Sequence, residues 1–405
     1  MDPQEVRIVV DSEARNNSSS VRWWHLVIIV LAVAVGWKLW KAGARVVREK
    51  RTAKLCLNSP RVVVLLHCFR EAPMCARTIM SLLRTAACRD HVSFWVYQEL
   101  DYGDMDVFRA CMEIAQTMEE RLAVERVRIV TVDNASEAGS GSLFAWSEML
   151  SRASDMTQAW VLLTTPGTAG TPDWDVHLLQ QSNRGSVLTC VPPSIDGPAA
   201  LSASIDGTVG GIARDWMRNM AASHEHTARI QHQQMPTFPV VGEMNGYFPE
   251  ISSRTFPLMP REPVEVLMAT CGCLFAPLHL LKHVLVPLRD FVVADYALDW
   301  IVSTALWSRE IHMLAPACAP PLVRVERART VRPTAWKSKE MLMKLLKNGG
   351  KGYAEFAGVD LSEGECFGRG RMGLLPSMSD VLVKFGSQAA FDRVKRMWTR
   401  ESIDN

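Results

Sequence analysis

Short apolar runs alternate with amphipathic segments through the first half of the chain. Residues 61–69 (RVVVLLHCF) form a β-rich apolar run typical of a buried parallel strand. Similar runs lie at residues 91–100, 127–133, 159–165 and 186–193. Helical spacing of apolar residues separates them, with helices expected at residues 75–87, 106–123 and 141–154. This order predicts right-handed crossovers and a single α/β domain with a twisted, mainly parallel sheet.

The second half of the chain has a different pattern. Residues 196–262 are rich in Gly, Pro, Ser, Met and Gln and have few periodic apolar positions, which predicts long loops over a site. An apolar run follows at residues 264–277, and helices are expected at residues 278–285, 297–309 and 338–347. The α/β domain is predicted to span residues 61–375, with a C-terminal helical tail at 376–405.

The clearest apolar segment lies near the N-terminus. Residues 23–39 (WWHLVIIVLAVAVGWKL) are apolar except for His25 and Lys38, and tryptophans at both ends suit the two membrane interfaces. We predict a retained transmembrane helix at residues 23–40, between a polar tail at 1–22 and a basic juxtamembrane linker at 41–60. The alternative is a buried core helix, but a helix that is apolar on all faces beside a charged linker has little to pack against.

Composition narrows the possible partners. Apolar residues make up 48% of the chain and charged residues 22%, as in globular proteins. The 45 Lys and Arg residues nearly balance the 43 Asp and Glu residues, so a nucleic-acid ligand is not expected.

Cysteine and histidine spacing does not predict a metal site. The ten cysteines form no CxxC pair, and Cys271 and Cys273 are expected to be buried thiols. The cluster of His224, His226 and His232 lies in a segment that favours a solvated polar loop over a metal site. Residues 368–373 (GRGRMG) match a dinucleotide-binding pattern literally, but no strand precedes them.

Candidate chemistry lies where the strands end. Ligands of open α/β sheets bind at the carboxyl ends of the strands, so residues that follow Leu66, Val132, Leu163 and Cys190 should line a site. His67 and Arg70 fall in the first of these positions. They could contact a nucleotide base or a diphosphate, or they could have a structural role in a turn.

Several blocks, in order and spacing, carry a family resemblance. Within residues 61–100 they include Arg70-Glu71, Thr78 and Ser81-Leu82. The later blocks are EAGSGSLFAWSEML (137–150), PDWD (172–175), VLTCVPP (187–193), CGCLFAP (271–277), LWSREIHMLAP (306–316) and EFAGVDL (355–361). Over residues 60–375 the chain resembles the polypeptide hydroxyproline GlcNAc-transferases, the family 60 glycosyltransferases. The resemblance implies transfer of a sugar, with GlcNAc the first candidate, from a UDP-sugar to a hydroxyl of a polypeptide or glycan acceptor.

The departures from this family concern its metal. An Asp-x-His motif that would hold a divalent ion falls on Thr165 and Gly167, which cannot replace a carboxylate and an imidazole. A later metal-binding His is absent, and Arg324 and Arg327 lie in its place. No metal ligands are therefore expected, and Mn²⁺ or Mg²⁺ would bind only if a site were reconstituted elsewhere.

The resemblance also implies roles for individual residues. Arg70 would contact the nucleotide, Asp299 would be the general base, and Arg324 or Arg327 would compensate the diphosphate charge. His67, Asp133 and Thr165 complete the expected nucleotide-sugar site. The alternative function is a catalytically inactive, membrane-tethered pseudo-glycosyltransferase that acts as a binding or scaffold protein, which the loss of metal ligands favours.

The distribution of positive charge predicts on which side of the membrane the α/β domain lies. Residues 38–54 carry seven Lys and Arg residues, whereas residues 1–22 carry three, so the positive-inside rule favours a cytosolic domain. Many anchored transferases of the secretory pathway have the opposite orientation. We predict a single-pass protein of the Golgi or endoplasmic reticulum membrane, and charge favours the cytosolic side for its domain.

Overall fold

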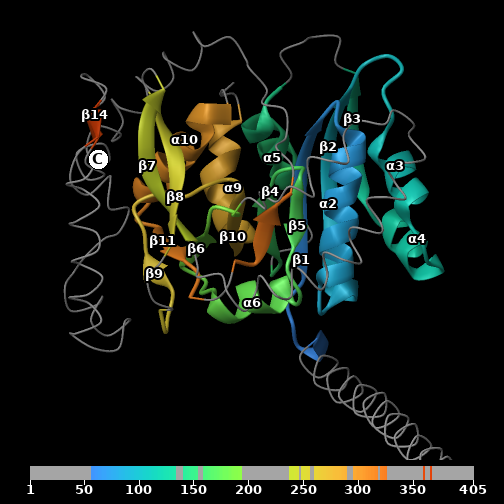
Figure 1. Cartoon of the computed structure of the whole chain (residues 1–405), viewed down its shortest axis with the longest axis horizontal. Coiled ribbons are helices and arrows are strands. Elements are labelled where there is room, and N and C mark those ends of the chain that lie inside the picture. Colours follow the sequence, from blue (N-terminus) through green and yellow to red (C-terminus); the bar gives the residue numbers. More distant parts are fainter. Residues whose placement is uncertain are drawn as a thin grey trace, which may run out of the picture. The chain divides into compact units, whose positions relative to one another are not determined.

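The structure is a computed structural model, shown in Figure 1. It describes residues 56–133, 140–153, 158–193, 237–245, 248–255, 260–289, 295–317, 320–325, 359–360 and 365–366. The chain divides into two compact units, Met1–Asn58 and Ser59–Asn405. All elements described below belong to the second unit.

An eight-stranded sheet organises this unit, in the order β3-β2-β1-β4-β10-β6-β11-β9. Its strands are β1 (Val62–Phe69), β2 (Val92–Leu100), β3 (Arg128–Asp133), β4 (Trp160–Thr164), β6 (Ser186–Thr189), β9 (Val264–Glu265), β10 (Cys273–Pro277) and β11 (His312–Ala315). Strands β3, β2, β1 and β4 are parallel, and so are β6 and β11. Strand β10 runs antiparallel to both β4 and β6, and β9 runs antiparallel to β11. The predicted mixed α/β fold with a mainly parallel sheet is confirmed.

Helices cover both faces of the sheet (Figure 1). They are α2 (Ala72–Thr85), α3 (Val107–Ile114), α4 (Met118–Glu125), α5 (Ser142–Ser151), α6 (Trp174–Gln181), α9 (Leu278–Leu285) and α10 (Asp295–Trp307), with short 3-10 turns η1 (Arg89–His91) and η3 (Val286–Leu288). Alternate residues of β1 enter two separate cores. Val62 and Val64 pack with α2 and Trp174, whereas Val63 and Leu65 pack with Trp146 and the α9–α10 face. A strand buried on both faces explains why the sequence of β1 is continuously apolar.

Three two-stranded antiparallel sheets complete the described part of the unit. They pair β5 (Thr168–Gly170) with β12 (Leu322–Arg324), β7 (Thr237–Asn245) with β8 (Phe248–Thr255), and β13 (Val359–Asp360) with β14 (Glu365–Cys366). The β7–β8 pair corrects the expectation of loops throughout residues 196–262. Asn245-Gly246 is a sequence signal for a tight hairpin, and Asn245 pairs with Phe248 across it.

The helix expected at residues 106–123 is two helices. The Asp106 side chain caps α3 by accepting from the Arg109 N–H at 2.8 Å, and α3 ends before Ala115, whose backbone is extended. The Thr117 hydroxyl then caps α4 by accepting from the Glu120 N–H at 3.1 Å. Two N-terminal caps eleven residues apart therefore divide what apolar spacing alone joins.

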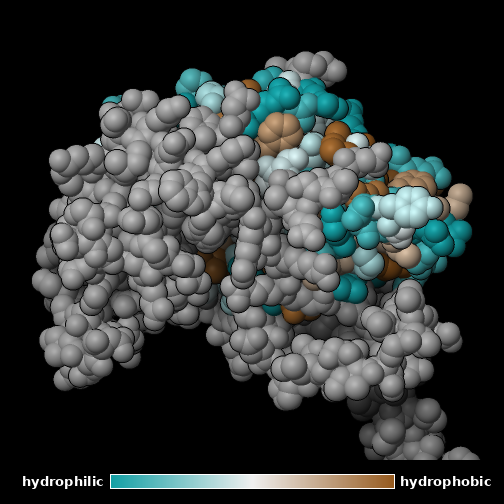
Figure 2. All heavy atoms as spheres, turned by 90° about the horizontal axis from the view of Figure 1, so that it is seen from above, coloured by the Kyte–Doolittle hydropathy of each residue, from teal (hydrophilic) through white to brown (hydrophobic). Residues whose placement is uncertain are grey.

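Exposed apolar side chains of the described residues are scattered. Phe108 lies on α3, and Met118 and Leu122 lie on α4. Figure 2 shows apolar residues interspersed with polar ones over the coloured part of the visible face. None of the helices in the described ranges is both long and apolar enough to cross a bilayer. The predicted helix at residues 23–40, the tail at 1–22, most of the linker, the helix at 338–347 and the tail at 376–405 lie outside the described residues.

Candidate active site

The candidate site lies at one edge of the large sheet, here called the carboxyl edge. Because β3, β2, β1 and β4 are parallel, their carboxyl ends meet there. The antiparallel β10 adds its amino end, since Cys273 pairs with Thr164, the last residue of β4. Loops that follow parallel strands and loops that precede β10 therefore converge on the same edge.

His67 lies within β1 rather than in the loop after it, since β1 continues to Phe69. It is buried, and both of its ring nitrogens are engaged. Its Nε2 lies 2.8 Å from Oε1 of Glu99 on β2, and its Nδ1 lies 3.0 Å from the Ser142 hydroxyl at the start of α5. His67 thus joins two strands to a helix, from within a strand and not from the turn in which a structural role was expected.

Glu99 is fully buried and is satisfied from two directions. Besides His67, both of its carboxylate oxygens accept from the Ser140 N–H, at 2.8 and 2.9 Å. A buried carboxylate is costly unless it is hydrogen-bonded in this way. Ser140 also hydrogen-bonds Tyr97, whose pKa burial raises and this contact partly lowers again. The resulting His67–Glu99 network fixes the entry to α5.

Arg70 follows β1 directly and is more accessible than His67. Its backbone has φ of 57°, and its N–H donates to the Glu99 carbonyl oxygen at 3.0 Å. Its guanidinium lies 3.1 Å from the carboxylate of Asp101, at the end of β2. Asp133 ends β3 and pairs with Leu100 in the ladder. Arg70, Asp101 and Asp133 therefore lie at consecutive strand ends, as a ligand site at this edge requires.

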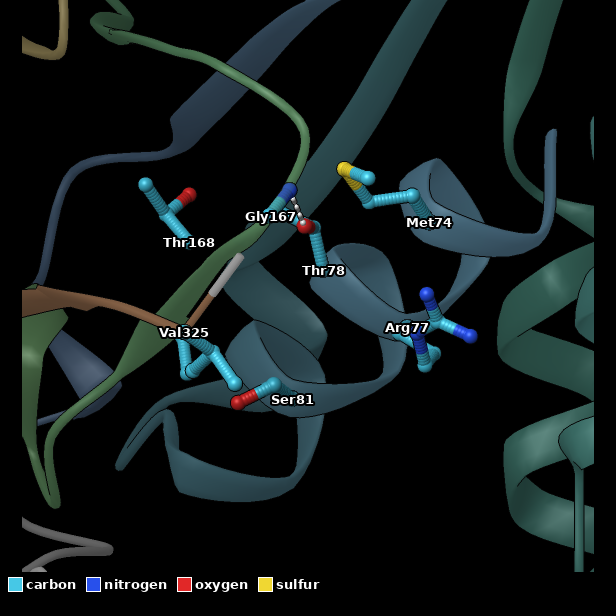
Figure 3. Close-up of a pocket in the computed structure, with 8 residues that line it drawn as sticks. Met74, Arg77, Thr78, Ser81, Gly167, Thr168 and Val325 are labelled. Carbon is cyan, nitrogen blue, oxygen red and sulfur yellow. Dashed lines mark hydrogen bonds between the residues drawn. The ribbon is translucent and has the colours of Figure 1, made fainter. Parts of the chain in front are cut away.

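The loop after β4 holds the positions at which the family resemblance would place a metal. Thr165 follows the last residue of β4, and Gly167 has a positive φ of 87°. The Gly167 N–H donates to the Thr78 hydroxyl of α2 at 2.9 Å, as Figure 3 shows. The Gly167 carbonyl oxygen accepts from the Val325 N–H at 2.8 Å. The loop is therefore held between α2 and β12, and it offers no carboxylate or imidazole.

A shallow pocket lies on the α2 side of this loop. Its lining includes Met74, Arg77, Thr78 and Ser81 of α2, together with Gly167 and Val325 (Figure 3). The surface that it exposes is almost entirely apolar, and it holds none of the anionic ligands that a divalent cation prefers. Elsewhere too, the described residues contain no group of three or more His, Cys, Asp and Glu residues arranged to hold a metal ion.

Arg324 reaches the carboxyl edge from β12. It pairs with Thr168 in the β5–β12 sheet, and its N–H donates to the Pro193 carbonyl oxygen at 2.9 Å. Its guanidinium lies close to Gly272, where an added Cβ would be 3.8 Å from Nη2 and 3.3 Å from a side-chain carbon of Pro192. The absent side chain of Gly272 thus leaves room beside the Arg324 guanidinium.

Asp299 lies one turn into α10 and is partly exposed. Its Oδ1 accepts from the Cys271 N–H at 2.7 Å. Desolvation raises the pKa of this carboxyl, while hydrogen bonds from the Cys271 N–H, the Cys271 thiol and the Thr270 hydroxyl, with the positive charge of Arg324, act in the opposite direction. Asp299 and Arg324 therefore belong to one site, on either side of Cys271-Gly272.

The sequence analysis missed several residues of this edge. Glu99 precedes the last residue of β2, so the strand-end rule could have found it. Ser140, Ser142 and Cys271 lie in blocks that carry the family resemblance, but no role in the site was expected for them. Cys271 and Cys273 are buried thiols outside any disulfide, as expected. Arg327, the histidines at 224, 226 and 232, and the glycine-rich stretch at 368–373 lie outside the described residues.

Comparison with known proteins gives only distant similarity. No family model matches the chain, and no curated protein matches it. A solved mannosyltransferase, PcManGT from Pyrobaculum calidifontis in complex with GDP-Man and Mn²⁺, has 15% identity and a TM-score of 0.37, over 78% of this chain and 74% of that one. The S. aureus protein TarS, residues 1–349 in complex with UDP-GlcNAc, has 10% identity and a TM-score of 0.40, over 75% and 69%. Similarity at this level carries no argument about activity, which has to come from the residues of the carboxyl edge.

Proposed function

We propose that this protein is a membrane-anchored glycosyltransferase that transfers a sugar from a UDP-sugar to a hydroxyl of a polypeptide or glycan without a metal ion. GlcNAc is the first sugar to test, on the family resemblance, and residues 23–40 would be the anchor. The observation that carries the proposal is the juxtaposition of Asp299 and Arg324 around Cys271-Gly272 at the carboxyl edge.

Asp299 has the properties of a general base. It is partly exposed, and desolvation raises its affinity for a proton. In the proposed reaction, its carboxylate takes the proton of the acceptor hydroxyl while the hydroxyl oxygen bonds to the anomeric carbon of the sugar. The bond between that carbon and the diphosphate breaks, and the nucleoside diphosphate leaves with the electron pair.

Arg324 would neutralise the leaving group. A diphosphate gains charge in the transition state, and a fixed cation stabilises that charge. Thr165 and Gly167 offer neither the carboxylate nor the imidazole of a metal motif, whereas a guanidinium can bind a diphosphate through two parallel hydrogen bonds. Backbone pairing of β12 with β5 supplies the fixed position that such a cation needs.

The nucleoside would bind near the ends of β1, β2 and β3. Arg70 is partly exposed there beside Asp101, and the His67–Glu99 network holds the entry to α5 underneath. In this proposal Arg70 contacts the nucleotide, whereas His67 supports the site without touching the ligand because both of its nitrogens are engaged within the protein.

One observation favours a second function, a membrane-tethered binding protein without catalytic activity. The described residues lack a metal-ligand group, and the Thr165–Gly167 loop is held by α2 and β12 instead of presenting ligands. Such a protein would keep nucleotide-sugar affinity and lose transfer. The two functions differ in turnover and agree in donor binding.

A thermal-shift titration tests the proposal. UDP- and GDP-sugars are added to the protein with Mn²⁺ and with EDTA, because a ligand of the native state raises the unfolding temperature. We expect stabilisation by a UDP-sugar that EDTA does not reduce. Arg324→Ala should weaken binding by about 1–3 kcal/mol, or roughly 5- to 150-fold, as for loss of a charge-assisted hydrogen bond. Arg109→Ala, on the exposed face of α3, is the matched control and should bind normally.

Transfer of labelled sugar to acceptor hydroxyls then separates the two functions. Turnover that Asp299→Asn abolishes supports the enzyme, and binding without turnover supports the binding protein. Strict dependence on Mn²⁺ would contradict the metal-free site. Asp173 and Asp175 would not be its ligands, because both lie near the C-terminal end of α2, away from the carboxyl edge: the Asp173 N–H donates to the Thr85 carbonyl oxygen, and Asp175 is buried and accepts from the Ala87 and Cys88 N–H groups, all at 2.8 Å.

A further inference from the structure

The segment before β10 is held to α10 at two points one helical turn apart. The Asp299 carboxylate accepts from the Cys271 N–H, and the Ser303 hydroxyl accepts from the Ala269 N–H at 2.9 Å. The same segment is held to β6 on its other side, where the Thr270 N–H donates to the Thr189 hydroxyl at 2.8 Å. Residues 269–271 are therefore fixed between α10 and β6, so their orientation relative to Asp299 is fixed as well.

Cys271 contributes two donors to Asp299. Its N–H lies 2.7 Å from Oδ1, and its thiol also hydrogen-bonds the carboxylate. Cys271 is only 2% exposed, so its side chain does not line the surface that a substrate would reach. Any effect of this residue on chemistry must therefore pass through Asp299.

We propose that Cys271 is a positioning residue for Asp299, whose N–H and thiol together hold the carboxylate in one orientation beside Arg324. This inference rests on the proposed function for its catalytic consequence, but the contact itself can be tested in a protein without activity. The thiol is the part that mutation can remove, since every substitution except proline keeps the N–H.

Removal of the thiol should change the pH at which Asp299 takes up a proton. A hydrogen bond to the ionised form of a carboxyl favours that form, so its loss raises the pKa of Asp299. If the carboxylate is the general base, the acid limb of the rate profile then moves to higher pH. Serine at position 271 restores a donor, and alanine does not.

Other ionisable groups lie on the elements around α10. Arg324 acts on Asp299 directly. The elements packed on α10 are α9, β8 and β11, of which α9 carries His279, Lys282 and His283 and β11 carries His312. Strand β8 includes Glu250 and Arg254, whose side chains lie outside the described ones. A comparison between variants at one position cancels these shared contributions, whereas a single profile does not.

The kinetic test compares the wild type, Cys271→Ala and Cys271→Ser over a range of pH. Cys273→Ala is the matched control, because Cys273 is an equally buried free thiol two residues away on β10. We expect Cys271→Ala to move the acid limb of kcat upwards by about half to one pH unit, the effect of one hydrogen bond, with KM for the donor unchanged. Cys271→Ser should restore the wild-type limb, and Cys273→Ala should not move it. An unmoved limb in Cys271→Ala overturns the proposal.

A second test needs no activity. The free energy of unfolding is measured against pH in each protein, alone and combined with Asp299→Asn, so that the difference isolates the titration of Asp299. Cys271→Ala should move this titration to higher pH, and Cys273→Ala should leave it in place. If the titration of Asp299 is the same in Cys271→Ala as in the wild type, the proposed contact between the thiol and the carboxylate is refuted. Absence of turnover with every donor, alongside a shifted titration, would refute the proposed function while the contact is upheld.

Discussion

At the scale of single residues, three carboxylates of the sheet region share one device. Glu99, Asp175 and Asp299 each accept hydrogen bonds from backbone N–H groups far away in the sequence, on Ser140, on Ala87 and Cys88, and on Cys271. Each therefore helps to fix a segment that lies outside the strands of the sheet. Charge patterns along the sequence cannot reveal these pairs, because a backbone donor carries no side-chain signature.

Asp299 makes folding depend on pH in a defined direction. Its pKa in the folded protein is raised, so the folded state binds the proton more tightly than the unfolded state does. Its contribution to stability is present below the unfolded pKa of about 3.9 and is lost as pH rises through the folded pKa. We expect the stability difference between the wild type and Asp299→Asn to fall over this window and then stay constant. Urea unfolding at a series of pH values measures it, and a difference that grows with pH would contradict the raised pKa.

Glu99→Ala should destabilise the fold. The change leaves His67 and the Ser140 N–H without the buried carboxylate that they share. Loss of a buried, charge-assisted partner costs about 1–3 kcal/mol. Glu113→Ala removes a half-exposed carboxylate that pairs with Arg109 on α3, and should cost about 0.5 kcal/mol or less. Urea unfolding of both variants makes the comparison, and equal losses would mean that the His67–Glu99 network adds nothing to stability.

At the scale of elements, the spacing of apolar residues predicted the strands and helices of the first half of the chain. Strands β1 to β4 and helices α2 and α5 were predicted because short apolar runs alternate there with segments of helical spacing, about 3.6 residues per turn. The direction of β10 does not, since CLFAP is equally apolar in a parallel or an antiparallel strand. The split between α3 and α4 and the β7–β8 hairpin depended on Thr117 and Asn245-Gly246, local signals that composition over a long window hides.

Gly170 on β5 has no space for a side chain against α2 and Trp174. An added Cβ would lie 2.5 Å from the Thr85 hydroxyl oxygen, 2.8 Å from Trp174 Cδ1 and 3.0 Å from Leu82 Cδ2. We expect Gly170→Ala to cost about 1–3 kcal/mol, because the buried neighbours have to shift. Gly185→Ala is the control, where the nearest atom is 3.8 Å away. Thermal unfolding compares them, and a stable Gly170→Ala would mean that α2 and β5 can separate at little cost.

At the scale of the whole molecule, the site is assembled from segments more than two hundred residues apart. The strand-end rule predicted Arg70 and Asp133 at one edge, and their backbones lie there. The meeting of Asp299 with Arg324 depends on the reversed β10, which brings Cys271-Gly272 to the same edge. From the sequence, the roles of Asp299 as base and of Arg324 as cation followed only from the family resemblance. The structure adds a geometric argument, because it brings the two side chains together. The role of Arg327 stays a prediction.

The membrane anchor also belongs to this scale. Because residues 23–39 are apolar between tryptophans, the full chain should sediment with membranes and resist extraction by carbonate, whereas a chain that begins at Pro60 should stay in the supernatant. Centrifugation after a carbonate wash measures both. Release of the full chain by the wash would rule out the span.

The order of strands in the large sheet has a consequence for the length of the segment that follows β6. The chain leaves the sheet after β6 and returns at β9, which pairs with β11, and it then pairs beside β6 again at β10, where the Cys190 N–H donates to the Cys273 carbonyl oxygen at 3.3 Å. The excursion from β6 to β9 thus begins and ends in the same sheet, with only β11 between its two ends. Closure entropy rises only slowly with length, by about 0.6 kcal/mol for each doubling, so insertions and deletions there disturb the sheet little. Related chains can therefore differ widely in length between β6 and β9 and still present the same carboxylate and guanidinium to the ligand.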